Sequence, residues 1–75
     1  MEQRSARHRA LGDAIREARA TAAISQEQLA LRCGLDRTYI GGIERGERNP
    51  SYANLLRVAD ALELRLSSLV AQAGD

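Results

Sequence analysis

The stretch between Gln26 and Arg45 constrains the fold of this chain more than any other feature. Two short helical patterns flank a glycine there, and small or branched apolar residues stand fifth, ninth, fifteenth and eighteenth: Ala30, Gly34, Ile40 and Ile43. Where two helices cross at about 90–120° over a short turn, the side chain beneath the second helix has to be small. A glycine suits the left-handed end of the first helix, and two isoleucines three apart share one face of the second. The spacing predicts a helix-turn-helix.

Capping residues define both helices of this motif. Ser25 followed by Gln28 forms the S-x-x-Q pattern of a capping box, so the first helix begins at residue 26. Asp36 is a suitable N-cap for the second helix. The glycine pair at 41–42 weakens that helix by about 1 kcal/mol per residue. The apolar face nevertheless continues beyond the pair, and a later glycine is a better stop, so we expect a helix over 37–45.

Three further helices complete the predicted bundle. After a polar, frayed start over 1–5, apolar residues at helical spacing indicate a helix from about Ala6 to Ala22. Ser51 follows a proline and caps a fourth helix, and Ser67 caps a short fifth one. The sequence therefore predicts an all-α, compact five-helix bundle that forms a single domain over residues 1–75.

Composition disfavours several other classes of protein. The 75 residues include no Phe or Trp, so a small core of Leu, Ile, Val and Ala is expected. A single cysteine, Cys33, cannot form an intrachain disulfide, and no His/Cys cluster suggests a metal site or a cofactor. The only histidine, His8, lies near the frayed end without a nucleophile or a phosphate loop, which argues against a hydrolase. We expect no enzyme activity and no small-molecule substrate.

No apolar run approaches the roughly 18 residues of a membrane span, and no signal peptide is apparent. These observations predict a soluble, cytoplasmic protein without a membrane partner.

The placement of arginine points to a polyanionic partner although the net charge is only +1. All 11 basic residues are arginine, which suits two-point hydrogen bonding to phosphate and guanine, but GC-rich coding also explains this. Arg37 is more informative, because a cation in the first turn of a helix opposes the helix dipole and so predicts a partner. A helix about 14 Å long fits a major groove about 12 Å wide. We predict double-stranded DNA as the partner. It would bind a polar surface with little steric bulk, formed by Arg37, Thr38, Gly41, Gly42 and Arg45.

Apolar residues near the C-terminus exceed what one small bundle buries. They are Leu56, Leu64, Leu66, Leu69 and Val70. Either all of them enter the core of the monomer, or some form a self-complementary patch between two copies of the chain. We favour a dimer surface over residues 62–73, with an interface made by Leu64, Leu66, Leu69 and Val70.

The run SQEQLALRCGLDRTYIGGIERGERNPS resembles the Cro and phage-repressor type of helix-turn-helix regulator, the XRE-like family. Within that family, LDRTYIGGIERGERN is similar to the controller proteins of restriction-modification systems. The resemblance implies a bacterial, nucleoid-associated transcription regulator that binds a palindromic operator as a homodimer, joined mainly through its fifth helix. The alternatives are a general phage-repressor-like or antitoxin-type regulator, or a protein-interaction module without specific DNA binding.

The resemblance also implies contacts between individual residues and DNA. Gln26 would grip a phosphate and brace the recognition helix, while Arg37 and Thr38 would face base edges. The remaining contacts would come from Tyr39, packed against the DNA backbone or a base step, and from Arg48 and Asn49, which would meet phosphates beyond the helix.

Two further features depend on the resemblance. It implies a buried salt bridge between Arg19 and Glu44, for which a catalytic acid at Glu44 is the rival interpretation. Relatives usually carry a serine and a larger polar residue where this chain has Gly41 and Gly42. Whether these glycines approach DNA or only weaken the helix stays open, and sequence reading is expected to shift to the start of the helix or to DNA shape.

Overall fold

The computed structural model describes the backbone of residues 2–75 and the side chains of residues 6–75. Five helices follow one another: α1 (Glu2–Ala22), α2 (Gln26–Cys33), α3 (Arg37–Glu44), α4 (Tyr52–Ala61) and α5 (Leu66–Gln72). No strand occurs among the described residues. The predicted all-α, five-helix architecture is confirmed.

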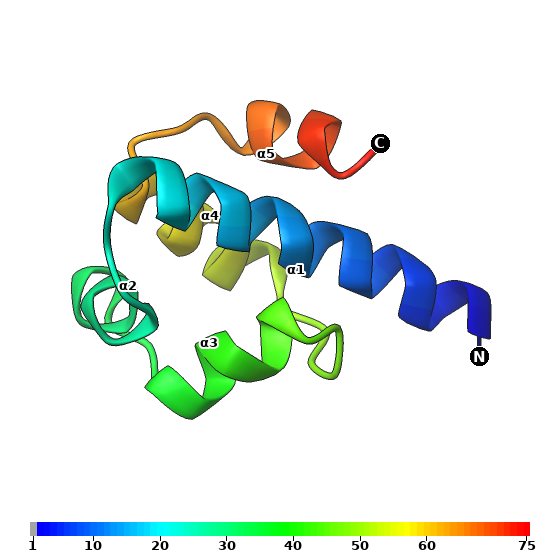
Figure 1. Cartoon of the computed structure of the whole chain (residues 1–75), viewed down its shortest axis with the longest axis horizontal. Coiled ribbons are helices and arrows are strands. Elements are labelled where there is room, and N and C mark those ends of the chain that lie inside the picture. Colours follow the sequence, from blue (N-terminus) through cyan, green and yellow to red (C-terminus); the bar gives the residue numbers. More distant parts are fainter. Residues whose placement is uncertain (1) are drawn as a thin grey trace.

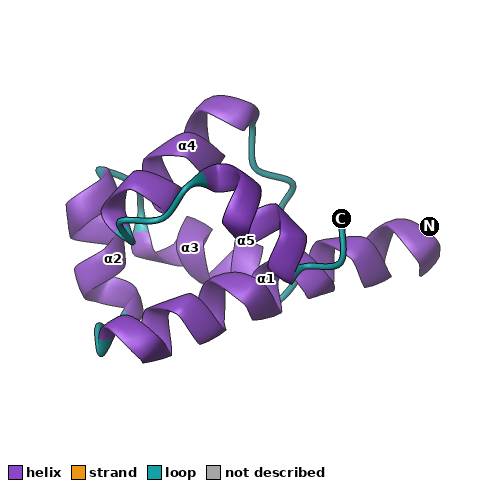
Figure 2. Ribbon diagram, turned by 90° about the horizontal axis from the view of Figure 1, so that it is seen from above, coloured by secondary structure: helices purple, strands orange, loops and turns teal. Residues whose placement is uncertain are grey.

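The long helix α1 is the spine of the bundle. It contacts α3 on one side and α5 on another, while α2 packs against α3 and α4, and α4 also contacts α5 (Figure 1). Seen from above, the N-terminal end of α1 projects beyond the C-terminus of the chain (Figure 2). The arrangement leaves α3 at the edge of the molecule, with one side available to a partner.

The caps that bound the helix-turn-helix largely follow the sequence pattern. The hydroxyl of Ser25 accepts a hydrogen bond from the amide of Gln28, whose side chain accepts one from the amide of Ser25, so the capping box is complete. Gly34 ends α2 with φ of 69°, a left-handed conformation that costs glycine little. Ser51 caps α4 by accepting from the amide of Asn54. Asp36 occupies the N-cap position of α3, but its side chain makes no capping hydrogen bond.

Three predicted boundaries were wrong. α1 begins at Glu2, not near Ala6, because residues 2–5 contain no glycine or proline to stop the helix; Met1 lies outside the described residues. α3 ends at Glu44, one residue early. Ser67 lies inside α5, whose N-cap position is held by Arg65 without a side-chain hydrogen bond. The helix starts there because Leu66 and Leu69, three residues apart, both pack into the bundle.

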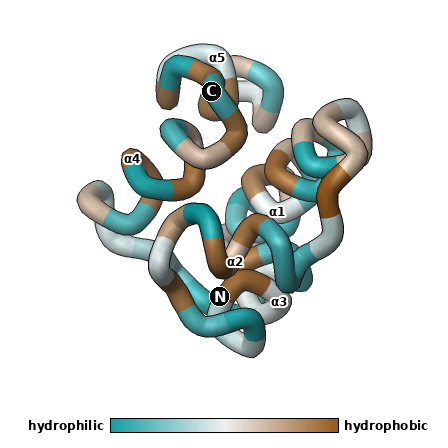
Figure 3. Tube along the Cα trace, turned by 90° about the vertical axis from the view of Figure 1, so that its left-hand side faces the viewer, coloured by the Kyte–Doolittle hydropathy of each residue, from teal (hydrophilic) through white to brown (hydrophobic). Residues whose placement is uncertain are grey.

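The core is small and aliphatic, as the composition predicts. Apolar and polar residues alternate along the helices, which is the pattern of amphipathic helices around one core (Figure 3). The largest fully buried apolar side chains are Ile15, Leu29, Ile40, Ile43, Val58 and Leu69. None of the described helices combines the length and apolarity needed to cross a bilayer.

Glycine allows α1 and the end of α3 to lie unusually close together. A Cβ atom on Gly12 would stand 2.4 Å from the carbonyl oxygen of Glu44 and 2.5 Å from that of Ile43. A Cβ on Gly46, where φ is +77°, would stand 2.9 Å from the backbone nitrogen of Arg9. Both neighbours are backbone atoms that cannot rotate away. The approach of these two helices therefore depends on the two glycines.

Candidate nucleic-acid interface

A buried carboxylate at the end of α3 joins the three N-terminal helices. Glu44 is only 1% exposed, and both of its oxygens accept hydrogen bonds from Arg19, at 2.8 Å from Nε and 3.0 Å from Nη2. Gln26 donates to the same carboxylate at 2.9 Å. Because these partners come from α1 and α2, one side chain fixes α3 against both helices. The predicted buried salt bridge between Arg19 and Glu44 is confirmed.

Arg16 is a fourth member of this network that the sequence analysis missed. Its Nε lies 3.6 Å from the Glu44 carboxylate, and its Nη2 donates to the Glu44 carbonyl oxygen at 3.2 Å. Arg16 thereby also satisfies a backbone carbonyl at the end of α3. The sequence did contain an indication of this role, because Arg16 and Arg19 stand three residues apart and share a face of α1.

The network lowers the pKa of Glu44. Burial by itself raises the pKa of this carboxyl, but hydrogen bonds from Arg19 and Gln26 and the positive charges of Arg19 and Arg16 outweigh that effect. The pKa of Arg19 is raised, chiefly by its hydrogen bond to Glu44, although burial opposes the shift. The ion pair is therefore kept fully charged, and Glu44 has no proton to donate near neutral pH.

The start of α3 is exposed and polar. Arg37 and Thr38 are its first two residues, and both lie open to solvent. Gln26, at the start of α2, is half-buried, with its amide nitrogen engaged by Glu44. The part of its predicted role that concerns bracing α3 thus has a direct structural counterpart.

Tyr39 and the loop after α3 form a second small cluster. The hydroxyl of Tyr39 accepts a 3.1 Å hydrogen bond from the side chain of Asn54 on α4, and the guanidinium of Arg48 lies 5.6 Å from the centre of the tyrosine ring. Asn49 is exposed in the same loop. Sequence reasoning missed Asn54, because nothing in the pattern of α4 pairs it with a residue of α3.

Two of the predicted contact residues on α3 are not exposed. Gly41 and Gly42 are both buried, so they do not form an open floor for DNA. The stem of Arg48 covers Gly42, while the ends of the Arg45 and Gln26 side chains lie over Gly41. Arg45 also pairs with Glu47 at 3.1 Å, with both side chains largely exposed.

The predicted dimer residues divide between the core and the surface. Leu69 is fully buried in the monomer, so it cannot offer surface to a second copy, and its assignment to the interface was wrong. It lies on the inner face of α5, where helical periodicity alone does not separate core from interface. Leu66 and Val70 are half-buried, and Leu64 is 37% exposed.

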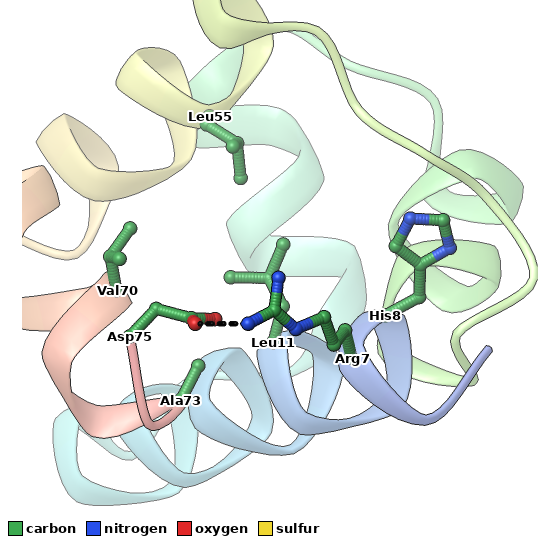
Figure 4. Close-up of a pocket in the computed structure, with 7 residues that line it drawn as sticks. All are labelled: Arg7, His8, Leu11, Leu55, Val70, Ala73 and Asp75. Carbon is green, nitrogen blue, oxygen red and sulfur yellow. Dashed lines mark hydrogen bonds and ion pairs between the residues drawn. The ribbon is translucent and has the colours of Figure 1, made fainter. Parts of the chain in front are cut away.

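Val70 also lines a groove of about 350 Å³ between α1, α4 and α5 (Figure 4). Leu11 and Leu55 make its apolar walls, and a 3.2 Å ion pair between Arg7 and Asp75 lies at its edge. No group of His, Cys, Asp or Glu side chains in the described part of the chain is arranged to hold a metal ion.

Residues 15–69, which span the network and all but the ends of the bundle, match the family described as Helix-turn-helix. This chain belongs to that family. Its members are DNA-binding regulators, and the predicted resemblance to the Cro and phage-repressor type, XRE-like, is confirmed. The Control protein C.SmaI of Serratia marcescens is 42% identical over 64 residues, which cover 85% of this chain and 76% of that protein.

Solved structures of helix-turn-helix proteins agree in sequence and in fold. The restriction-modification controller protein C.AhdI from Aeromonas hydrophila has a TM-score of 0.82 at 45% identity, over 83% of this chain and 94% of that one. The controller protein C.Esp1396I, solved as a tetramer in complex with its natural 35 base-pair operator, has a TM-score of 0.79 at 30% identity, over 92% and 96% of the two chains. The predicted similarity to restriction-modification controller proteins is confirmed.

Proposed function

We propose that this helix-turn-helix protein is a restriction-modification controller protein that binds a palindromic double-stranded DNA operator as a homodimer. One observation carries the proposal: the start of α3 is exposed and carries Arg37 and Thr38, while its other end is locked to α1 and α2 through Glu44. A recognition helix has to expose the side chains that read bases, and it has to be held at a fixed angle. The exposed start of α3 meets the first requirement, and the contacts of Glu44 with α1 and α2 meet the second. The controller proteins C.SmaI and C.AhdI, which resemble this chain, support the finer assignment.

The proposed contacts divide into base reading and backbone anchoring. Arg37 presents a planar fork that can match O6 and N7 of a guanine, and Thr38 stands beside it. Phosphates of the same groove would pass near the start and the end of α3. The residues proposed to contact them there are Gln26, Tyr39, Arg45, Arg48 and Asn49. Two recognition helices in a dimer would meet half-sites about one helical turn, ~34 Å, apart.

The proposed dimer uses the surface of residues 62–73 without Leu69. Leu64, Leu66 and Val70 retain exposed apolar area on α5 and the segment before it, which suits a self-complementary interface. We also propose that the protein is not an enzyme and acts in the bacterial cytoplasm at the nucleoid. Glu44, the one buried acid among the side chains that the structure describes, is held in ion pairs with arginine and is not available for catalysis.

The proposal can be tested by selecting an operator from random duplex DNA and then measuring binding to it at increasing salt concentrations. Binding should weaken steeply as salt rises, because each neutralised phosphate releases counterions. A protein-interaction module built on leucines would lack this dependence.

Arg37→Ala should cost about 1 to 3 kcal/mol of binding free energy and relax the preference at one base position. Arg57→Ala, which removes the same charge from an exposed position on α4, is the matched control. If Arg37→Ala keeps the selectivity of the unmodified protein, the assignment of Arg37 to base reading is wrong.

A further inference from the structure

We propose that Gly42 is a positioning residue: because it lacks a side chain, Arg48 can lie across the recognition helix as a preformed contact for a DNA phosphate. The inference deepens the DNA binding proposed above and rests on it. It also explains why a buried glycine stands in the middle of α3, where it weakens the helix.

The loop after α3 folds back onto Gly42. Gly46 turns the chain with φ of +77°, and its amide donates to the carbonyl oxygen of Ile43 at 3.0 Å. The next two amides, of Glu47 and Arg48, then both donate to the carbonyl oxygen of Gly42, at 2.8 and 3.2 Å. The backbone of Arg48 is thereby fixed beside residue 42 before any side chain is considered.

The stem of the Arg48 side chain fills the space that a side chain at residue 42 would need. A Cβ on Gly42 would stand 2.5 Å from Cγ of Arg48 and 3.6 Å from its Cβ and Cδ. Cγ is close to the anchored backbone and cannot swing away without the whole side chain leaving. Gly41 differs, because a Cβ there would meet only the far ends of side chains, Nη1 of Arg45 at 3.1 Å and Oε1 of Gln26 at 3.7 Å.

The far end of Arg48 is held by Tyr39. A guanidinium within about 6 Å of a ring centre is attracted to its face, and here the distance is 5.6 Å. Tyr39 in turn is tied to α4 through the 3.1 Å hydrogen bond from Asn54. Gly42, Tyr39 and Asn54 thus fix the beginning and the end of one exposed arginine.

Arg48 keeps its charge available. The ion pairs found among the described residues use other arginines, namely Arg7, Arg16, Arg19 and Arg45. A flexible arginine loses rotamer freedom when it binds, and a side chain that is already ordered loses less. A phosphate is the ligand that fits, because a planar guanidinium donates two parallel hydrogen bonds to its oxygens.

The positioning step can be tested without DNA. Protons of the Arg48 guanidinium group, which lies over the ring of Tyr39, should show upfield NMR shifts from the ring current. Gly42→Ala should abolish these shifts in a folded protein. Gly41→Ala, which also adds one methyl group to α3, is the matched control and should retain them. If Gly42→Ala keeps the upfield shifts, Gly42 does not position Arg48.

A double-mutant cycle on the selected operator tests the consequence. Gly42→Ala and Arg48→Ala should each weaken binding about tenfold and reduce the slope of log K against log salt by about 0.9 for each phosphate that is no longer neutralised. The double variant should bind no more weakly than Arg48→Ala alone. Additive effects of the two changes would mean that the new methyl group obstructs DNA directly. Unchanged binding of Gly42→Ala would mean that Arg48 does not bind a phosphate from this position. Either result overturns the proposal.

The seating of Arg48 by Gly42 and the contact of Arg48 with a phosphate are refuted by different results. Absence of salt-dependent DNA binding by the unmodified protein would refute the proposed function, and with it the phosphate contact. The NMR comparison would still decide whether Gly42 seats Arg48.

Discussion

The junction of α1, α2 and α3 combines aliphatic packing with a buried polar network, whereas α4 and α5 pack mainly through aliphatic side chains. At the junction, Glu44 receives hydrogen bonds from α1 and α2, and Gly12 lets two backbones approach closely. On the other side, Val58 and Leu69 are fully buried, while Leu64 stays partly exposed. Aliphatic packing is therefore common to both halves of the bundle, and the junction adds a buried polar network to it.

The difference suits what each half has to do. Hydrogen bonds and ion pairs are directional, so the Glu44 network permits few orientations of α3, and a recognition helix needs one orientation. Aliphatic contacts tolerate changes of shape better. A surface built from them can be shared between the core of the monomer and a second copy. The following variants test this comparison, from the largest expected effect to the smallest.

Glu44→Ala should have the largest effect. Removing one partner of a buried ion pair leaves uncompensated charge and typically costs about 3 to 5 kcal/mol of the free energy of unfolding. Glu47→Ala, which removes an exposed carboxylate from its pair with Arg45, should cost less than about 1 kcal/mol. Urea unfolding of both variants measures the difference. Equal effects would show that the junction is not held by its buried charge.

Leu69→Ala should lower the free energy of unfolding by about 2 to 5 kcal/mol, because it empties a fully buried site. Leu64→Ala removes the same atoms from a partly exposed residue. It should affect unfolding less and weaken the dimer in sedimentation at low concentration. If Leu64→Ala leaves the dimer unchanged, the surface over 62–73 is not where two copies meet.

Gly12→Ala should cost about 1 to 3 kcal/mol, because its Cβ would meet backbone oxygens at the α1–α3 crossing. Gly41→Ala serves as the matched control. Its methyl group would meet only the ends of the Arg45 and Gln26 side chains, and it should stabilise α3 by up to about 1 kcal/mol through helix propensity. Opposite signs in thermal unfolding are expected. A gain of stability in Gly12→Ala would contradict the close approach of the helices.

Acid should weaken the junction more gently than mutation, because a protonated Glu44 keeps its volume and part of its hydrogen bonding. Its pKa is lowered in the folded chain, so its contribution is fully present above the ordinary glutamate value of about 4.3. That contribution is lost as pH falls from there through the lowered pKa. Glu44→Gln should flatten this part of the stability curve, because it removes the group that titrates there. Identical acid profiles for Glu44→Gln and the unmodified protein would argue against the shift.

Local signals in the sequence predicted the helix-turn-helix well. The capping box at Ser25, the left-handed turn at Gly34 and the cap at Ser51 each involve atoms a few residues apart, so their geometry follows from the local pattern. Family resemblance supplied the pairing of Arg19 with Glu44, which lie 25 residues apart.

The errors occurred where several elements compete for one residue. Periodicity marked Leu69 as apolar but could not decide between the core of the monomer and a second copy. Ser67 is a good cap in isolation, yet the packing of Leu66 and Leu69 set the start of α5. The polar face of α3 suggested an open floor at Gly41 and Gly42, which side chains from outside the helix cover.

The sequence by itself determined that this chain forms five helices and that one pair of them is a helix-turn-helix, because capping, glycine conformation and apolar spacing act over a few residues. The tertiary structure alone decided the further contacts that hold and present α3. The contacts of Gly12 with the end of α3, Arg16 with Glu44, Asn54 with Tyr39 and Arg48 with Gly42 join separate elements. Such contacts exist only once the helices have packed, since packing determines which distant side chains meet.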